Sequence, residues 1–437
     1  MRRRTGATAP RAPRDTGPPP PGLRTVTGGP DRADTRSAGL APDTVDADVP
    51  AAVGRMLVGV LGEQVTRAAG IERTFAQDVA ARVARFTLDG GKRTRSQFLW
   101  WGLRSCQGRP GAGDVETALR VAAAVELLQT CALIHDDAMD RSPLRRGRPA
   151  VHAAFAAQYA TPDTAEAAGR FGTAAAVLTG DLALAWADDT VAGIELGAAA
   201  GPRVRHLWRA MRMEMVAGQY LDLYGQIAGS RSVALAVRTA YLKSARYSVE
   251  RPLALGAALA GADEPTTRAL SAAGRCAGVA FQFQDDLLGV FGDQERTGKP
   301  SGGDIREGKH TYLLAVGRAR ALQRRDRAAL ALLDRCVGDS GLDAADLERV
   351  RAVLVATGAP GLVERRIHRL VARSIRHLDA AAPEPAAAAR LRGLFASVAG
   401  LRTAGGHPRP AARTGGAAAP VPARAARGPA AAERGTV

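Results

Sequence analysis

The chain carries two short acidic clusters, each inside an apolar run with helical spacing. In the first, LIHDDAMD, the acids Asp136, Asp137 and Asp140 stand at i, i+1 and i+4, so a helix would project them from one face. Three carboxylates this close cannot all stay ionised without cations. Oxygen ligands without His or Cys suit Mg²⁺, which also takes phosphate oxygens from a substrate. Arg145 and Arg146 follow and are suited to bidentate phosphate binding, so this cluster predicts a metal and phosphate site.

The same residues also fit a solvated helix end whose acids pair with neighbouring arginines. The apolar approach CALI makes full solvation of the acids less favourable. His135 directly precedes the acids and His152 follows the segment RRGRP. Each histidine is either a structural hydrogen-bonding side chain or a substrate contact.

The second cluster lies in FQFQDDLLGVFGD, where Asp285 and Asp286 are adjacent. Burying one ionised carboxylate without a partner costs free energy, and burying two side by side costs more. The sequence therefore predicts a positive partner opposite them. Gln282 and Gly289 share the same helical stripe, and Gly289 stands where a third acid could point at the same place.

Lysine is scarce in this chain, and each lysine lies in a segment that could bind phosphate. Only four of the 60 basic residues are lysines: Lys92, Lys243, Lys299 and Lys309. Because a compact ammonium is not equivalent to a planar guanidinium, we expect these four to bind phosphate. The stretch GKPSGGD, which contains Lys299, predicts a mobile loop that closes over the site and excludes water.

The rest of the chain determines the fold class. Residues 50–401 place apolar residues three and four apart and predict one all-α domain. Residues 1–49 and 402–437 are rich in Arg and Pro and predict disordered tails. The net charge of +17 suits nucleic acid, a membrane surface or polyanionic small molecules, and the acidic motifs argue against a nucleic-acid partner. No uncharged apolar run reaches about 18 residues, so no transmembrane segment is expected.

Seven motifs occur in order along the chain: GGKRTR, LIHDDAMD with RRGRP, Gly180–Asp181, GQYLD, LKS, FQFQDD and GKPSGGDIREGK. In this order they resemble the trans-isoprenyl diphosphate synthases of the polyprenyl synthetase family, and most of all the actinobacterial geranylgeranyl diphosphate synthases. The resemblance implies an isoprenoid synthase fold, with helices around a central cavity. It also implies a homodimer, and the four cysteines without ligand spacing are typical of the cytoplasm.

The resemblance assigns a role to each motif. It implies about three Mg²⁺ ions per active site. The metal ligands carried over from the two acidic motifs are Asp136, Asp137, Asp140, Asp285 and Asp286. The residues that match the isopentenyl diphosphate pocket are Lys92, Arg95, Gln129 and Arg146. Those that match ligands of the allylic diphosphate are Arg145, Lys243, Ser244, Gln282, Lys299 and Lys309.

Three of these positions depart from the family pattern. Gln129 stands where many relatives have His, and Ser244 stands where Thr is more frequent. Gly289 replaces the third Asp of the second motif. We expect Asp285 to ligate the metal, Asp286 to support it, and position 289 to be dispensable.

The implied reaction is Mg²⁺-dependent condensation of isopentenyl diphosphate with an allylic diphosphate (dimethylallyl, geranyl or farnesyl). Metal ions, Lys and Arg stabilise the departing pyrophosphate, and the allylic cation is then attacked by the second substrate. Cys131 and Ala132 precede the first motif, where bulky residues stop chain growth in this family. Both are small, which favours geranylgeranyl diphosphate over farnesyl diphosphate and leaves longer products open. The motifs also leave open a terpene cyclase of the same fold and a non-catalytic synthase subunit.

Overall fold

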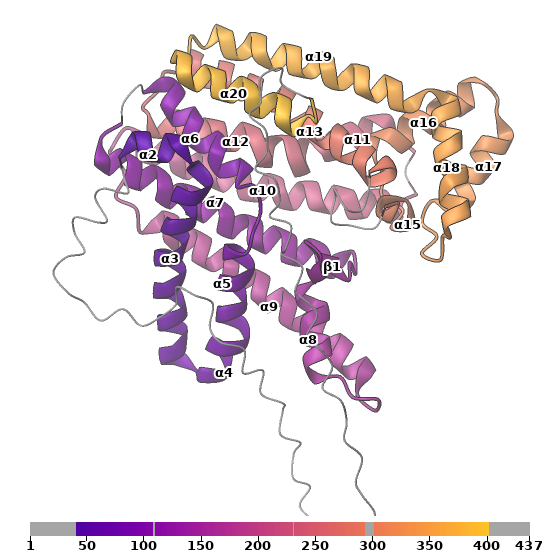
Figure 1. Ribbon diagram of the computed structural model, residues 1–437, viewed down its shortest axis with the longest axis horizontal. Helices are drawn as coiled ribbons and strands as arrows, with labels where there is room; N and C mark the ends of the chain where they lie inside the picture. The colour runs from indigo at the N-terminus through magenta and orange to yellow at the C-terminus, as the bar shows by residue number, and fades with distance from the viewer. Residues whose placement is uncertain (1–40, 108–109, 230, 293–300, 402–437) are drawn as a thin grey trace, which may run out of the picture. The chain divides into compact units, whose positions relative to one another are not determined.

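Helices make up almost all of the chain described by the computed structural model, which covers residues 41–107, 110–229, 231–292 and 301–401. The first half contains α2 (Pro42–Ala47), α3 (Val49–Ile71), α4 (Arg73–Phe75), the π-helical turn η1 (Ala76–Ala80), α5 (Ala81–Leu88), α6 (Thr94–Cys106), α7 (Ala112–Met139), α8 (Val151–Tyr159), α9 (Ala165–Ala192) and α10 (Ala200–Ile227). The second half contains α11 (Val233–Thr239), the π-helix η2 (Ala240–Glu250), α12 (Arg251–Leu259), α13 (Glu264–Phe291), α15 (Gly303–Arg306), α16 (Tyr312–Gln323), α17 (Arg327–Cys336), α18 (Ala344–Thr357), α19 (Ala359–Ala380) and α20 (Pro385–Val398). Figure 1 shows their arrangement, which confirms the predicted all-α class.

One short hairpin interrupts the helices of the described residues. Strand β1 (Leu144–Arg145) pairs antiparallel with β2 (Arg148–Pro149), so that Leu144 lies opposite Pro149. Arg146 and Gly147 form its turn with positive φ angles of 55° and 74°. The hairpin follows directly after the first acidic motif and holds Arg145 next to the end of α7.

Helix α7 lies at the centre of the first half and packs against α3, α6 and α9. Its residues Val121 to Val125 are all buried, so this helix is covered on every side. Gly113–Met139 is the one described segment long and apolar enough to cross a membrane. Because 72% of that window is buried inside the fold, α7 behaves as a core helix.

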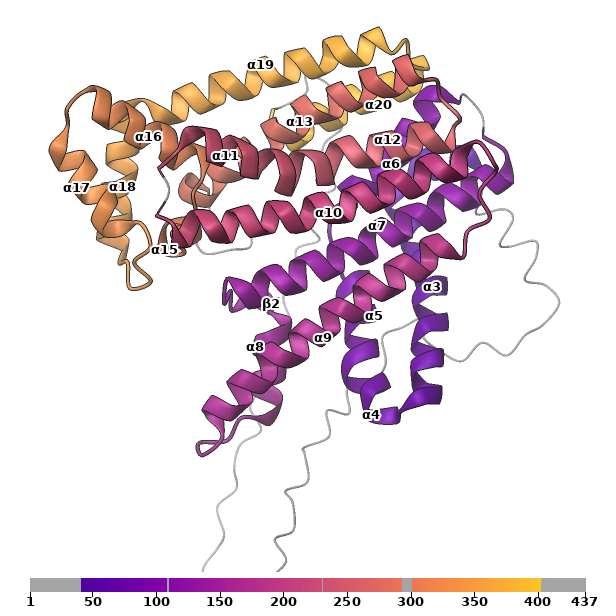
Figure 2. The same cartoon turned by 180° about the vertical axis from the view of Figure 1, so that it is seen from behind.

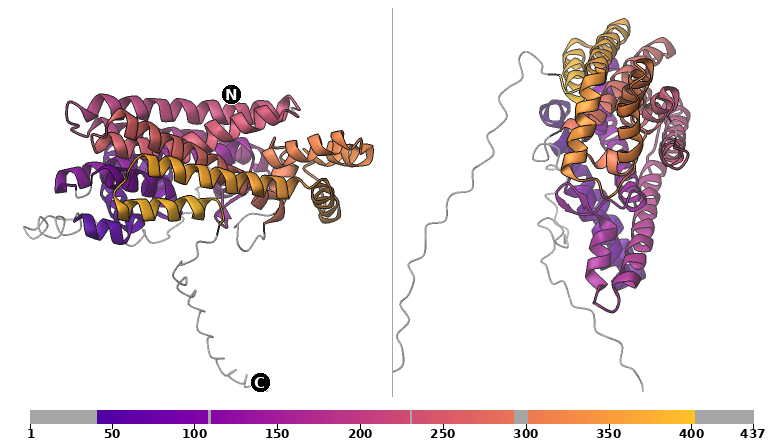
Figure 3. Two further views of the ribbon diagram at one scale, coloured as in Figure 1. Left: turned by 90° about the horizontal axis from the view of Figure 1, so that it is seen from above. Right: turned by 90° about the vertical axis from the view of Figure 1, so that its right-hand side faces the viewer.

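A second core cluster lies among the later helices. α13 packs along α19 and against η2, and Figures 2 and 3 show α19 running beside α13. The buried side chains Phe283, Leu313 and Leu354 belong to this cluster, which places the second acidic motif on a firmly packed helix.

The helical domain begins before residue 50, where the sequence predicted a disordered tail. Helix α2 starts at Pro42, and its Val45 is fully buried. Asp46 Oδ1 accepts a hydrogen bond of 2.8 Å from Trp100 Nε1, and Asp46 Oδ2 lies 2.6 Å from Arg104 Nη2. This helix has only six residues, so it is too short to produce a helical repeat in the sequence. Lys299 and the remainder of both predicted tails lie outside the described residues.

Candidate active site

A cavity of about 320 Å³ lies between α7, α10, η2, α13 and the segment that precedes α16. Most of the predicted site residues line it, although they come from distant parts of the sequence. Its charged and polar lining residues include Arg95, Gln129, Asp136, Arg145, Gln219, Asp222, Lys243, Ser244, Gln282, Asp285, Asp286, Asp304 and Lys309. Both acidic motifs therefore meet at one cavity.

Asp136 is the acid of the first motif that faces this cavity. Its Oδ1 accepts hydrogen bonds from Gln219 Nε2 at 3.1 Å and from Lys243 Nζ at 3.0 Å. Burial opposes its ionisation, but the charges of Lys243, Lys309 and Arg145 outweigh burial and hold the pKa of Asp136 well below its usual range. The carboxylate is therefore fully ionised and surrounded by cations.

Lys243 forms a bridge between two acids. Its Nζ lies 3.0 Å from Asp136 and 2.6 Å from Asp222 Oδ2. Burial lowers its pKa, but these two carboxylates raise it above the ordinary value, so Lys243 is charged.

A Cβ on Gly218 would lie 2.4 Å from the Lys243 backbone nitrogen, so the glycine of GQYLD lets α10 approach η2. Sequence reasoning assigned no role to Gln219 or Asp222, although the motif GQYLD contained the signal.

Asp137 does not line the cavity and pairs with Arg145. Arg145 Nε donates to both Asp137 oxygens at 2.9 Å, and Arg145 Nη2 donates to Asp137 Oδ1 as well. The Asp137 side chain is 1% exposed. This bidentate pair fixes the guanidinium at the cavity wall and does not favour the predicted metal-ligand role of Asp137.

Asp140 is held by Lys309, which lies between α15 and α16 in the segment 307–311, called the Lys309 loop here. Lys309 Nζ lies 2.7 Å from Asp140 Oδ2 and 2.7 Å from Glu307 Oε2. Burial opposes the charge of Lys309, yet Asp140 and Asp304 raise its pKa well above the usual value. The loop ammonium therefore connects the first acidic motif to the region of the second.

The two acids of the second motif lie in different environments. Asp285 is exposed and lines the cavity. Asp286 is 3% exposed; its Oδ1 accepts from Gln282 Nε2 at 2.8 Å and its Oδ2 from the Tyr312 amide at 2.9 Å. Burial raises the pKa of Asp286 to about 8. The expectation of two buried charges is therefore wrong for Asp285. Through the Tyr312 amide, Asp286 connects α13 to the start of α16.

Part of the predicted isopentenyl diphosphate set also lines the cavity. Arg95 Nη2 donates to Ser248 Oγ at 2.8 Å, and its guanidinium lies 4.6 Å from the centre of the Tyr247 ring. Arg95 Nε and Gln129 Oε1 are buried without a hydrogen-bond partner among the described residues. Buried polar atoms are normally paired, so these two atoms indicate a place for a polar ligand.

Lys92 and Arg146 lie apart from this wall. Lys92 is exposed, and Arg146 Nη1 donates to the Phe86 carbonyl at 3.2 Å. Nearby, the buried Arg93 pairs with Glu126 at 3.0 Å and anchors the GGKRTR loop. Nothing in the local sequence pattern indicates the Arg93–Glu126 pair, since the partners are far apart in the chain.

The two predicted chain-length residues face different surroundings. Ala132 lines the cavity with Leu133 and Tyr247. Cys131 is 1% exposed in the core, and its Sγ lies 3.7 Å from His135 Nδ1. The structure therefore supports Ala132 as a wall residue and places Cys131 behind that wall.

His135 has a structural role. Its Nε2 lies 3.1 Å from the Val177 carbonyl oxygen on α9. A Cβ on Gly180 would lie 2.2 Å from His135 Nε2, which explains the glycine of the Gly180–Asp181 motif. His135 therefore joins α7 to α9.

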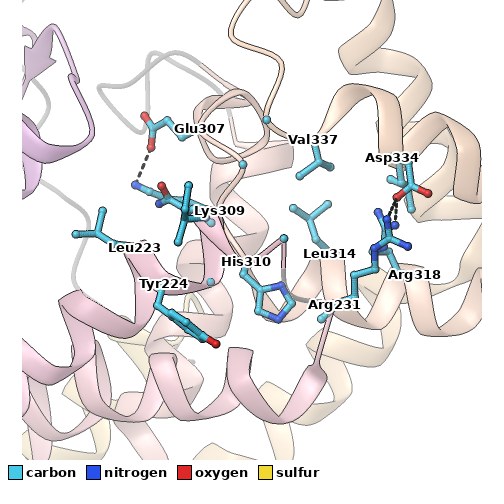
Figure 4. A pocket seen from close by; sticks show the side chains of 18 of the residues that line it. Leu223, Tyr224, Arg231, Glu307, Lys309, His310, Leu314, Arg318, Asp334 and Val337 are labelled. Carbon is cyan, nitrogen blue, oxygen red and sulfur yellow. Dashed lines mark hydrogen bonds and ion pairs between the residues drawn. The ribbon is translucent and has the colours of Figure 1, made fainter.

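A larger cavity of about 760 Å³ lies on the other side of the Lys309 loop. Figure 4 shows Lys309 beside Glu307 on one side, and Arg231 and Arg318 beside Asp334 on the other. The acids of both motifs line the smaller cavity, so size does not identify the reacting site.

Among the described residues, no group of three or more His, Cys, Asp or Glu side chains is already arranged as a metal site. Asp136 is instead paired with Lys243 and Arg145, and Asp140 with Lys309. Carboxylate oxygens from two helices at one phosphate-sized cavity nevertheless fit Mg²⁺ chemically. On binding, a metal ion would replace the Lys and Arg side chains as the partner of the acids, and a diphosphate would replace the acids as the partner of the Lys and Arg side chains.

The helical arrangement and the two facing acidic motifs define an isoprenoid synthase fold. The family model for polyprenyl synthetase matches residues 77–354, and the chain belongs to this family of prenyltransferases. It is 31% identical over 295 residues to geranylgeranyl diphosphate synthase of Mycobacterium tuberculosis, which covers 68% of this chain and 77% of that protein.

Solved structures agree with the family assignment. The crystal structure of geranylgeranyl pyrophosphate synthase from Corynebacterium glutamicum, complexed with isoprenyl diphosphate and magnesium, is 38% identical. It matches with a TM-score of 0.76 and covers 81% of this chain and 98% of that one.

A further relative by sequence makes a different product by its name. The geranylfarnesyl diphosphate synthase of Aeropyrum pernix is 29% identical over 65% of this chain and 82% of that protein.

Proposed function

We propose that the protein condenses isopentenyl diphosphate with allylic diphosphates and releases geranylgeranyl diphosphate. The observation that carries this proposal is the cavity where Asp136 and Asp285 meet Lys243, Lys309 and Arg145. Cations and acids in this number at one cavity suit a diphosphate with its metal ions. The names of the Mycobacterium and Corynebacterium relatives support the product.

Mg²⁺ is the proposed cofactor, held by Asp136 and Asp140 on the side of α7 and by Asp285 on α13. Bound Mg²⁺ supplies positive charge that stabilises the departing pyrophosphate. The magnesium in the Corynebacterium relative supports this choice. We propose about three ions per site, the number that the family resemblance implies.

The chain's own residues divide the work between two ends of the cavity. Lys243, Lys309 and Arg145 would bind the allylic diphosphate and stabilise the negative charge that develops on it. Ser244 Oγ donates to Gln282 Oε1 in the lining of the same cavity, and both side chains are proposed to bind the allylic diphosphate as well. Lys299 is proposed to join this set.

At the other end, Arg95 and Gln129 would bind isopentenyl diphosphate through their unpartnered atoms. Lys92 and Arg146 would complete this pocket by turning toward the bound phosphate. The two substrates would then lie side by side, so that the double bond of one can attack the allylic carbon of the other. The proton lost from the product would pass to the leaving pyrophosphate.

The decisive experiment measures condensation directly. Purified protein with Mg²⁺ and isopentenyl diphosphate is given each allylic diphosphate, and product length is determined by chromatography. We expect the geranylgeranyl product, together with a loss of about a hundredfold or more in kcat for Asp136→Asn. Glu116→Gln is the matched control, because this side chain is 44% exposed and its change only breaks an ion pair with Arg120. Absence of condensation with every starter would refute the enzyme proposal, and farnesyl diphosphate as end product would refute the proposed length.

We further propose a cytoplasmic homodimer. Helices α9 and α10 lie on the face turned toward the viewer in Figure 2, and Asp188 of α9 joins them by accepting from Trp208 Nε1 at 2.8 Å. Exposed apolar side chains gather on both helices: Phe171, Leu178, Met213, Val216, Tyr220 and Tyr224. Met213, Val216, Tyr220 and Tyr224 follow a spacing of three, four and four and form one stripe. An apolar face of this kind suits a second copy of the chain.

A further inference from the structure

The second acidic motif ends at Gly289, and the carboxyl group of Asp304 lies where a side chain at this position would stand. Asp285, Asp286 and Gly289 repeat the spacing of Asp136, Asp137 and Asp140, but position 289 has no carboxylate. A Cβ built on Gly289 would lie 2.3 Å from Asp304 Oδ2 and 3.0 Å from Asp304 Cγ. The carboxyl group of Asp304 therefore fills the space that a side chain at position 289 would take.

Backbone hydrogen bonds hold Asp304 in this position. The Gly302 amide donates to the Gly289 carbonyl at 2.9 Å, which ties the start of α15 to α13 at the glycine itself. The Lys309 amide donates to the Asp304 carbonyl at 2.9 Å. Because an Asp side chain is short and its backbone is fixed at both ends, Asp304 has little room to withdraw from a new side chain at position 289.

The charge of Asp304 acts on the same cavity as the second motif. Asp304 lines that cavity with Asp285 and Lys309. Burial lowers the pKa of Lys309, but Asp140 and then the Asp304 carboxylate raise it, and the Asp304 carboxylate also adds to the effect of burial in raising the pKa of Asp286. The Asp304 carboxylate of α15 therefore acts on the same part of the cavity as the missing third acid of the motif would.

We propose that Asp304 supplies the third carboxylate of the second acidic motif from α15, and that Gly289 is required to admit it. This inference depends on the proposed diphosphate and metal site. It replaces the expectation that position 289 is dispensable, since a side chain there would displace Asp304. The carboxylate would hold Mg²⁺ directly or through its bound waters.

The test measures how much Mg²⁺ the full-length protein needs to bind inorganic pyrophosphate, by calorimetric titration without turnover. Asp304→Asn removes the charge and keeps the shape, so the Mg²⁺ concentration for half-maximal pyrophosphate binding should rise about tenfold or more. Asp334→Asn is the matched control, because this acid pairs with Arg231 and Arg318 on the far side of the loop. The control should leave the Mg²⁺ requirement unchanged.

A reciprocal exchange tests the role of the glycine. Gly289→Asp alone should raise the Mg²⁺ requirement despite the added acid, because the new side chain displaces Asp304. The double variant Gly289→Asp with Asp304→Gly places one acid in the freed space and should return the requirement to within about threefold of the starting protein. Thermal unfolding of each variant checks the fold, and Asp304→Asn alone suffices if the position 289 variants do not fold.

Two results would overturn the inference while leaving the proposed function intact. One is an unchanged Mg²⁺ requirement in Asp304→Asn, and the other is tighter Mg²⁺-dependent binding in Gly289→Asp with Asp304 still present. If the unaltered protein bound no pyrophosphate with Mg²⁺, the proposed function itself would fail and the inference with it.

Discussion

At the residue scale, the site is a set of acids whose behaviour depends on which neighbour each one meets. Asp136 and Asp137 are adjacent in sequence, yet one faces the cavity and the other pairs with Arg145. Asp285 and Asp286 are adjacent as well, and only Asp286 is buried. The spacing of the motifs could not separate these roles, because neighbouring helical residues differ in direction by about 100° and the packing decides which direction is buried.

Asp286 should make stability depend on pH in the metal-free protein. Its pKa rises from 3.8 to about 8 on folding, so the folded protein holds a proton across that interval which the unfolded chain releases. The contribution of this group to stability therefore falls as the pH rises from about 4 to about 8. Asp286→Asn stays neutral throughout, so the variant should lose less stability than the unaltered protein between about pH 5 and 8.

Urea unfolding in the presence of a chelator, repeated across this pH interval, measures the effect. Asp163→Asn changes an exposed acid and should leave the pH dependence as it is in the unaltered protein. Equal slopes for the unaltered protein and Asp286→Asn would contradict the assignment of a buried, proton-holding carboxyl group.

At the element scale, α7 brings both an acid of the first motif and a small wall residue to the cavity. The helix ends at Met139, so its last turn carries Asp136 while the turn before it carries Ala132. Cys131 is one residue away but projects into the core. The direction in which α7 faces its neighbours therefore decides which of these two adjacent small residues borders the cavity.

Ala132→Phe should shorten the product, because a ring at this position enters the cavity that Ala132 lines. Cys131→Phe should instead overpack the core and reduce stability by roughly 1–3 kcal/mol. Product length by chromatography and unfolding free energy by denaturant titration distinguish the two variants. A shortened product from Cys131→Phe in a protein of full stability would show that Cys131 also borders the chain channel.

At the scale of the whole molecule, the exposed apolar side chains of α9 and α10 predict self-association. Leu178→Glu and Met213→Glu place charges on these helices, where the side chains are 63% and 69% exposed in the single chain. Each variant should change the protein from a dimer to a monomer, because burying an unpaired charge at an interface is costly. Light scattering on an eluting column measures the mass, for which one chain contributes 45.5 kDa.

Leu322→Glu is the control for this test, since Leu322 is 67% exposed on α16, away from α9 and α10. We expect this variant to remain dimeric. A monomeric unaltered protein at micromolar concentration would contradict the proposed interface.

The sequence by itself determined the all-α class, the family and most of the charged and polar residues that line the cavity. This was possible because helical spacing, scarce lysines and ordered motifs are local features that survive without a structure. The motif GQYLD also carried Gln219 and Asp222, although their role became clear only when Lys243 was seen between α10 and η2.

Tertiary structure alone decided which of these residues act together. The pairing of Arg93 with Glu126, the withdrawal of Cys131 into the core and the helix before residue 50 depend on contacts between distant segments. The clearest case is Gly289, which the sequence presents as a lost acid. The structure shows Asp304 in the space beside it, because a backbone hydrogen bond from Gly302 to Gly289 brings the start of α15 against α13. Spatial proximity of this kind leaves no periodic trace in the sequence, so only the folded chain could reveal it.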